Sequence, residues 1–207
     1  MKSTRESVMS SRASSPRRQG SSNEPGGPGS RVRGNGKPSS RWPQDTFRVL
    51  KELGVRQVAY VPDSGHSELI RTCHADRELK TVVLTTEEEG IAMLAGAWLG
   101  GERGVLLMQS SGTGNCINML GLSAECRFPL LMLVTMRGHW GEFNPWQVPM
   151  SQATAPALTA MGVLVHQVDE ADRVAETVDA AGRLAFNTGR SVAVLISQRI
   201  VGAKQFK

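Results

Sequence analysis

From Trp42 onward, short apolar runs alternate with segments whose apolar residues recur every three or four positions. The second pattern is typical of helices, whereas short continuous runs of Val, Leu, Ile and Met are typical of buried strands. Six strands are therefore predicted, at residues 56–61, 80–85, 104–109, 129–136, 163–168 and 191–196. Helices are predicted at about 44–53, 64–75, 87–100, 115–125, 151–161 and 170–187.

Strands that alternate with helices pair in parallel through crossover connections. Several of the runs show no polar alternation, which indicates burial on both faces. The predicted fold class is α/β, an open, doubly wound, six-stranded parallel sheet flanked by helices. Ligands of such sheets bind at the carboxyl ends of the strands. Four connections follow strands there, at residues 62–68, 86–90, 110–115 and 137–150.

Charge is distributed unevenly along the chain. Residues 1–44 hold nine Lys or Arg against two acids; since the net charge is +5, residues 45–207 carry −2. A first segment rich in Ser, Gly, Pro and Arg cannot bury a core, so we expect 1–44 to be a disordered basic tail and 45–207 to be the folded domain. A transit peptide or a weak contact with a polyanion is the alternative for this tail. We expect no nucleic-acid partner for the folded part.

No stretch approaches the roughly 18 apolar residues of a membrane span, so we expect no membrane contact. Cys73, Cys116 and Cys126 form neither an even disulfide framework nor a metal-ligand pair, which favours a reducing cytoplasm and no metal site.

Two glycine-containing connections have more than one interpretation. Residues 110–115, "SSGTGN", let backbone amides approach a ligand, but the third glycine of a dinucleotide fingerprint and the Lys of a phosphate-binding loop are missing. They form either a ligand loop or an ordinary strand-to-helix turn. In "VPDSGHSEL", Asp63 or Ser64 either caps the next helix, or Asp63, Ser64 and His66 point into the cleft.

The connection at 137–150 is long and rich in aromatic and polar residues, with Arg137, His139, Trp140, Glu142 and Trp146. Long loops of this kind are typical of interfaces and active-site covers. Arg137 either binds an anionic substrate or forms a structural ion pair with Glu142.

Three glutamates, Glu87, Glu88 and Glu89, begin the predicted helix at 87–100. Acids in a first turn complement the helix dipole, by roughly 0.3–1 kcal/mol each. The helix that follows, "GIAMLAGAWLGG", is small and apolar on all sides, so a carboxylate at its edge is poorly solvated and suited to chemistry. Successive helix residues are rotated by about 100°, so the three side chains cannot share one role.

The order "VPDS", "TEEEGIAMLAGAWL", "GVLLMQSSGTGNCIN" and "PLLMLVTMRG" resembles the pyrimidine-binding (Pyr) domain of thiamine-diphosphate-dependent decarboxylases. That family carries H-E-Q-G-A-A-x-x-A-x-G-Y-A, then T-S-G-P-G-x-x-N. On this chain the family's His falls on Glu87 and its catalytic Glu on Glu88, or on Glu87 or Glu89 if the alignment slips by one. The resemblance is strongest to sulfopyruvate decarboxylase alpha subunits and the matching half of phosphonopyruvate decarboxylase, which share an E-E-x-G helix start and R-G followed by Q-V-P.

The resemblance implies specific site residues. Glu88 is expected to hydrogen-bond the aminopyrimidine ring of thiamine diphosphate and so to be catalytic. The same coenzyme is expected to contact the later motif, and a small anionic 2-keto acid to contact the loops after the first and fourth strands. The coenzyme-binding candidates are Glu88, Ser111, Gly112, Thr113, Gly114 and Asn118, and the substrate-binding candidates are Asp63, Ser64, His66, Arg137 and His139.

The family's G-D-G…N-N motif, which holds the diphosphate and Mg²⁺, occurs nowhere in the chain. The resemblance therefore implies a beta subunit that carries this half, in an α2β2 or larger assembly. The expected activity is decarboxylation of sulfopyruvate to sulfoacetaldehyde and CO2. The alternatives are phosphonopyruvate or another small 2-oxo acid as substrate, or a non-catalytic regulatory subunit with the same fold.

Overall fold

A computed structural model describes residues 41–203 of the chain. The strands are β1 (Val55–Tyr60), β2 (Lys80–Val83), β3 (Arg103–Gln109), β4 (Leu130–Thr135), β5 (Leu164–Val168) and β6 (Ser191–Ile196). The α-helices are α1 (Trp42–Glu52), α2 (Ser67–Ala75), α3 (Glu87–Leu99), α4 (Thr113–Cys126), α5 (Gln147–Ala160), α6 (Val174–Thr188) and α7 (Gln198–Val201). Short 3-10 turns, η1 (Ser110–Gly112) and η2 (Ala171–Arg173), precede α4 and α6.

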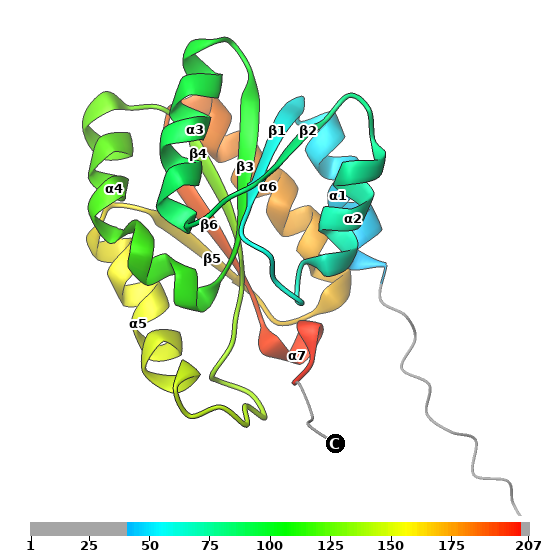
Figure 1. The fold of residues 1–207 in the computed structure, drawn as a ribbon, viewed down its shortest axis with the longest axis vertical. Coiled ribbons are helices and arrows are strands. Elements are labelled where there is room, and N and C mark those ends of the chain that lie inside the picture. The colour runs from blue at the N-terminus through cyan, green and yellow to red at the C-terminus, as the bar shows by residue number, and fades with distance from the viewer. Residues whose placement is uncertain (1–40, 204–207) are drawn as a thin grey trace, which may run out of the picture. The chain divides into compact units, whose positions relative to one another are not determined.

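All six strands pair in parallel in the order β2-β1-β3-β4-β6-β5 (Figure 1). The four residues of β4 from Leu130 to Leu133 are fully buried, as expected for a central strand covered on both faces. The predicted fold class is confirmed.

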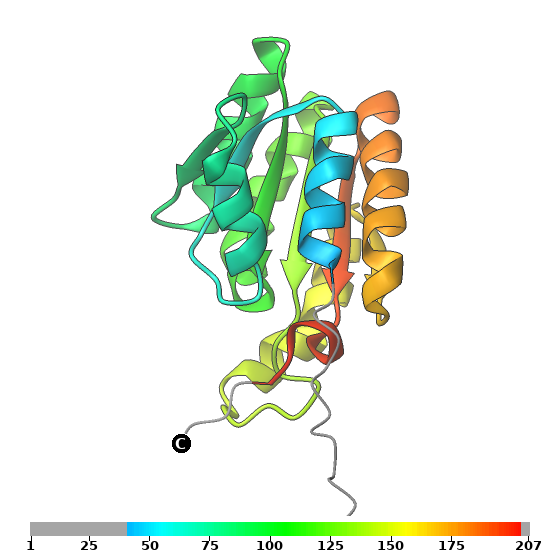
Figure 2. The same ribbon diagram turned by 90° about the vertical axis from the view of Figure 1, so that its right-hand side faces the viewer.

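Two apolar cores lie on opposite faces of the sheet. Alternate residues of the central strands contribute to each, so that Leu107 and Leu133 belong to one core and Leu106 and Met132 to the other. The first core packs against α1, α2 and α6, and the second against α3, α4 and α5. Figure 1 shows these two groups on either side of the sheet, and Figure 2 shows α1 and α6 next to each other on one face.

The two ends of the described chain differ from the expectation. Helix α1 begins at Trp42, which is buried, and Pro43 occupies its first turn, where a missing N–H costs nothing. The folded part therefore starts before residue 45, and the rest of the predicted tail, residues 1–40, lies outside the described residues. Helix α7 was not predicted because four residues are too few to show a helical repeat.

Helix α3 lies unusually close to the sheet at its first turn. A Cβ on Gly90 would lie 2.6 Å from Leu106 Cδ1 and 2.9 Å from Leu84 Cδ1. A larger residue at this position would force these leucines or the helix to shift, so glycine permits the close approach of helix to strand. Within residues 41–203, no helix is long and apolar enough to cross a bilayer.

Candidate active site

The three glutamates at the start of α3 have different surroundings. Glu89 caps the helix, because its Oε2 accepts a hydrogen bond from the Thr85 backbone N at 2.8 Å. This side chain satisfies an amide beside the helix N-terminus, in the manner of a capping box. Glu89 therefore has a structural role.

Glu87 is buried, with 7% of its surface exposed, and its carboxylate lies against η1. Asn115, on the first turn of α4, donates to its Oε2 at 2.8 Å. A Cβ on Gly112 would overlap with the Glu87 carboxylate, so this position of the Glu87 side chain depends on the glycine. Glu87 thus joins the start of α3 to the loop after β3.

Glu88 is exposed, and its carboxylate accepts no hydrogen bond and forms no ion pair within residues 41–203. Buried Cys116 lies near both carboxylates. Burial, followed by the charges of Glu87 and Glu88, raises the pKa of its thiol to about 12, so the thiol stays protonated at neutral pH.

Asp63 connects three strand ends. Its Oδ2 accepts from Thr135 Oγ1 at 2.5 Å and from the Gly65 backbone N at 3.1 Å, and its Oδ1 accepts from Gln109 Nε2 at 3.0 Å. Burial acts to raise the pKa of this carboxyl, but the hydrogen bonds from Thr135, Gln109 and Gly65 together bring it below its ordinary value. Asp63 is therefore an ionised, well-anchored group at the site.

His66 does not reach the cleft, contrary to expectation. It is fully buried, and its Nε2 lies 3.0 Å from the Leu133 carbonyl oxygen, which fixes the proton on that nitrogen. Burial lowers the pKa of the imidazole, so the ring is neutral. Its Nδ1 has no hydrogen-bond partner among the described residues.

Arg137 forms the structural ion pair that was one of its two interpretations. Its Nε lies 2.6 Å from Glu142 Oε2, and its Nη2 lies 2.7 Å from Oε1. The two side chains are 9% and 3% exposed. Arg137, with backbone and Gln198 donors, lowers the pKa of Glu142 to about 2. The pair is ionised and neutral as a unit, so it does not supply a net positive charge.

Gln198, from α7, holds the loop that follows β4. Its Oε1 accepts from the backbone N of His139 and of Trp140, and its Nε2 donates to Glu142 at 2.9 Å. His139 Nε2 lies 3.2 Å from Ser197 Oγ. His139 lines a different cavity from Arg137, a space of about 260 Å³ next to Ser151 and Asp169.

A cavity of about 190 Å³ opens at the carboxyl ends of β1 and β4. Asp63, Ser64, Thr135 and Arg137 line it, together with the residues that follow α7. Three of the five predicted substrate residues therefore meet in one place. The exceptions are His66, which is buried, and His139, which lies in the neighbouring cavity.

The predicted coenzyme residues on the loop after β3 have mixed positions. Gly112 and Thr113 are buried, whereas Ser111, Gly114 and Asn118 are exposed. Asn118 makes no contact with Glu87; Asn115, three residues earlier, makes it. Asn115, Gln109 and Gln198 were missed, because a single polar side chain gives no pattern in the sequence.

Comparison with known proteins identifies the fold and its lineage. Residues 43–154 match the family described as thiamine pyrophosphate enzyme, N-terminal TPP binding domain. The chain belongs to this family. Over 151 residues, 72% of this chain and 90% of the other, it is 31% identical to sulfopyruvate decarboxylase subunit alpha of Methanococcus maripaludis.

Two other proteins extend this TPP-family comparison. The chain is 40% identical over 99 residues to phosphonopyruvate decarboxylase of Streptomyces hygroscopicus, covering 47% of this chain and 25% of that protein. A 2-oxoglutarate:ferredoxin oxidoreductase from Magnetococcus marinus superposes with a TM-score of 0.65 at 16% identity, over 77% of this chain and 29% of the other. At that identity the likeness concerns the fold alone.

The residues of this TPP-family domain fit one half of a thiamine diphosphate molecule. A carboxylate is fixed by Asn115 beside a loop whose glycine leaves room for it, which suits a polar, planar pyrimidine. Within residues 41–203, no cluster of three His, Cys, Asp or Glu is arranged to hold a metal ion. The described part of the chain thus offers an oriented carboxylate that suits the pyrimidine.

Proposed function

We propose that this chain is the alpha subunit of a heteromeric thiamine-diphosphate-dependent decarboxylase of small 2-keto acids. The family match and the similarity to decarboxylase alpha subunits support this proposal. The observation that carries it is the buried carboxylate of Glu87 against the η1 loop, because it provides an oriented acid at the edge of the sheet where ligands bind. A beta subunit with the G-D-G…N-N motif would complete the site.

When bound, thiamine diphosphate supplies a carbon nucleophile and then stores the electrons released as CO2 departs. The role of this chain would be to hold a proton at the pyrimidine ring nitrogen through one glutamate. Glu87 suits that role better than the expected Glu88, since its carboxyl is buried and fixed in direction. Glu88 is exposed in the isolated chain and suits a contact with the partner subunit.

Substrate would lie in the 190 Å³ cavity, which is below the roughly 300–1,000 Å³ of sites for drug-sized ligands and suits a small acid. Among the described residues that line it, the side-chain donors without a partner are the Ser64 hydroxyl and the N–H groups of Arg137 that do not face Glu142. Among residues 41–203, ionised Asp63 and the neutral Arg137–Glu142 pair give the cavity no net positive charge. Cations for a sulfonate substrate would therefore come from outside this range, and the beta subunit is the proposed source.

The experiment is co-expression of the full chain with a candidate beta subunit, followed by measurement of CO2 release with thiamine diphosphate and Mg²⁺. Sulfopyruvate, phosphonopyruvate and pyruvate are compared as substrates. We expect Glu87→Gln to reduce turnover at least 100-fold while the two subunits still co-purify. Glu88→Gln and Glu89→Gln are matched controls that remove the same charge from adjacent positions.

The outcomes separate the possibilities. A loss confined to Glu88→Gln would move the catalytic role to Glu88 without changing the function. Turnover that survives all three substitutions would show that this chain supplies no acid and would favour a regulatory subunit. Release of CO2 from phosphonopyruvate in preference to sulfopyruvate would reassign the substrate.

A further inference from the structure

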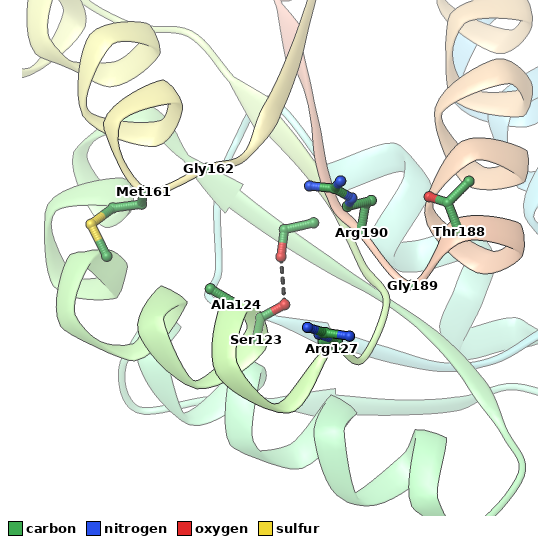
Figure 3. A pocket seen from close by; sticks show the side chains of 9 residues that line it. Ser123, Ala124, Arg127, Met161, Gly162, Thr188, Gly189 and Arg190 are labelled. Atoms are coloured by element: carbon green, nitrogen blue, oxygen red, sulfur yellow. Dashed lines mark hydrogen bonds between the residues drawn. The ribbon is translucent and has the colours of Figure 1, made fainter.

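A polar pocket away from the candidate active site lies at the opposite, amino end of the sheet (Figure 3). It has a volume of about 540 Å³ and is bounded by the ends of α4, α5 and α6 and the start of β6. Ser191, at its base, begins β6, whereas the candidate active site lies beyond the other end of the strands. Six residues of β6 span roughly 16–20 Å, so the two sites are separate.

Two arginines, Arg127 and Arg190, line this pocket, and both are exposed. Figure 3 shows their side chains on either side of the hydrogen bond made by Ser123. Neither guanidinium forms an ion pair or a hydrogen bond with another residue in the range 41–203, and no acidic side chain lines the pocket. The pocket therefore presents two uncompensated positive charges.

The hydroxyl groups of the pocket are already used within the protein. Ser123 Oγ donates to the Phe128 carbonyl at 3.0 Å and lies 2.6 Å from Ser191 Oγ, and Thr188 Oγ1 donates to Leu184 O at 2.6 Å. The free donors are thus the N–H groups of the two guanidiniums. Their planar fork matches the oxygens of a phosphate.

The backbone conformation of Arg127 is a second observation that favours a role in binding. With φ at 55°, Arg127 is the one non-glycine residue of the range 41–203 in the left-handed region. It ends α4, at a position where glycine is favoured. Gly189 ends α6 in the same conformation, and a Cβ there would lie 3.0 Å from the Arg127 carbonyl oxygen. Of these two helix ends, one thus has glycine in the left-handed conformation and the other has an arginine, which is strained there.

A positive charge at a helix C-terminus also offsets the helix dipole, which would be a purely structural role for both arginines. A basic residue anywhere in the last turn gives this interaction with the helix dipole. It requires neither an arginine in the left-handed backbone conformation nor two arginines in one pocket. We propose that Arg127 and Arg190 form a binding site for a small molecule carrying a phosphoryl group. The apolar side of the pocket, at Met161 and Ala124, would take the rest of the ligand.

Isothermal titration of the full chain with inorganic pyrophosphate tests this proposal, with ionic strength held constant by NaCl. We expect saturable binding with a stoichiometry of one, weakened at least tenfold by Arg190→Gln or Arg127→Gly and lost when both are combined. Glycine suits the backbone at position 127, so this variant should fold. Arg77→Gln, which removes an exposed arginine from the turn before β2, is the matched control and should bind like the original chain.

Absence of binding, or binding that survives the double substitution, would overturn the site. The second result would assign the binding to other cations, for which the basic residues 1–44 are the first candidates. Methanesulfonate serves as a singly charged comparison, and we expect it to bind more weakly than pyrophosphate; equal binding would contradict a site for phosphoryl groups. Because the assay needs no beta subunit and no thiamine diphosphate, its outcome is independent of the proposed decarboxylase function.

Discussion

The charged side chains at the two ends of the sheet differ in whether other residues hold them. At the carboxyl end, Asp63, Glu87 and the Arg137–Glu142 pair are each held by partners from other elements. At the amino end, Arg127 and Arg190 face a pocket with no partner among the described residues. Hydrogen bonds from other elements fix the direction of the charged groups at the carboxyl end, whereas nothing in the described residues holds the two guanidiniums, so all of their N–H groups are available to a ligand.

The strongest test of the carboxyl end is removal of Glu142. Arg137 would be left buried without its counter-charge, so we expect Glu142→Ala to lower the free energy of unfolding by about 3–5 kcal/mol in urea denaturation. Asp179→Ala, which breaks the exposed ion pair with Arg183, should cost less than about 1 kcal/mol. Equal losses of stability from both substitutions would show that the buried pair matters no more to the fold than the exposed one.

The same pair predicts a dependence of stability on pH. The pKa of Glu142 is about 2 in the folded chain against 4.5 as its ordinary value. The ionised carboxylate therefore stabilises the fold above pH 4.5, and this contribution, on the order of 2–3 kcal/mol, is lost as the pH falls towards 2. Between pH 7 and pH 3, the free energy of unfolding should fall less with pH in Glu142→Gln than in the original chain. Equal pH dependence in both would contradict a stabilising role for the ionised Glu142 carboxylate.

Gly112→Ala tests the contact between the η1 loop and Glu87. The added methyl would overlap with the Glu87 carboxylate, so one of the two segments must shift. We expect a loss of about 1–3 kcal/mol in thermal unfolding, as for other overpacked sites. Gly121→Ala, on the same face of the sheet but with open space around it, is the control and should be neutral or slightly stabilising.

The smallest expected effect is at the amino end. Arg127→Gly relieves the left-handed strain and should raise the free energy of unfolding by about 0.5–1 kcal/mol. Gly189→Ala should do the opposite, because alanine at φ 65° is strained and approaches Arg127 O. A loss of stability in Arg127→Gly would mean that the arginine supports the fold, which would weaken the comparison between the two ends.

Much of the fold could be predicted from the sequence because its signals are local. The continuous apolar run that became β4 and the helical repeat of α6 each show their structure within a few residues. The boundary at Trp42 was missed because its burial depends on the distant residues against which α1 packs.

The site was predicted less completely, for a physical reason. The motifs selected loops that do lie at the carboxyl ends of the strands, and Asp63, Ser64 and Arg137 line one cavity there. The sequence could not tell which of three adjacent glutamates is buried, because that depends on how α3 is rotated against the η1 loop. The burial of His66 beside the Leu133 carbonyl likewise depends on tertiary packing, so it leaves no pattern in the sequence around His66.

The glycine at position 90 has a consequence beyond packing. Since the first turn of α3 rests directly on Leu106 and Leu84, the height of Glu87 above the strands is set by the absence of one methyl group. We expect a larger residue there to push either these two leucines or the helix start, and in the second case to carry the acid away from Asn115. The position of the carboxylate thus depends on a residue one helical turn away that does not line the site.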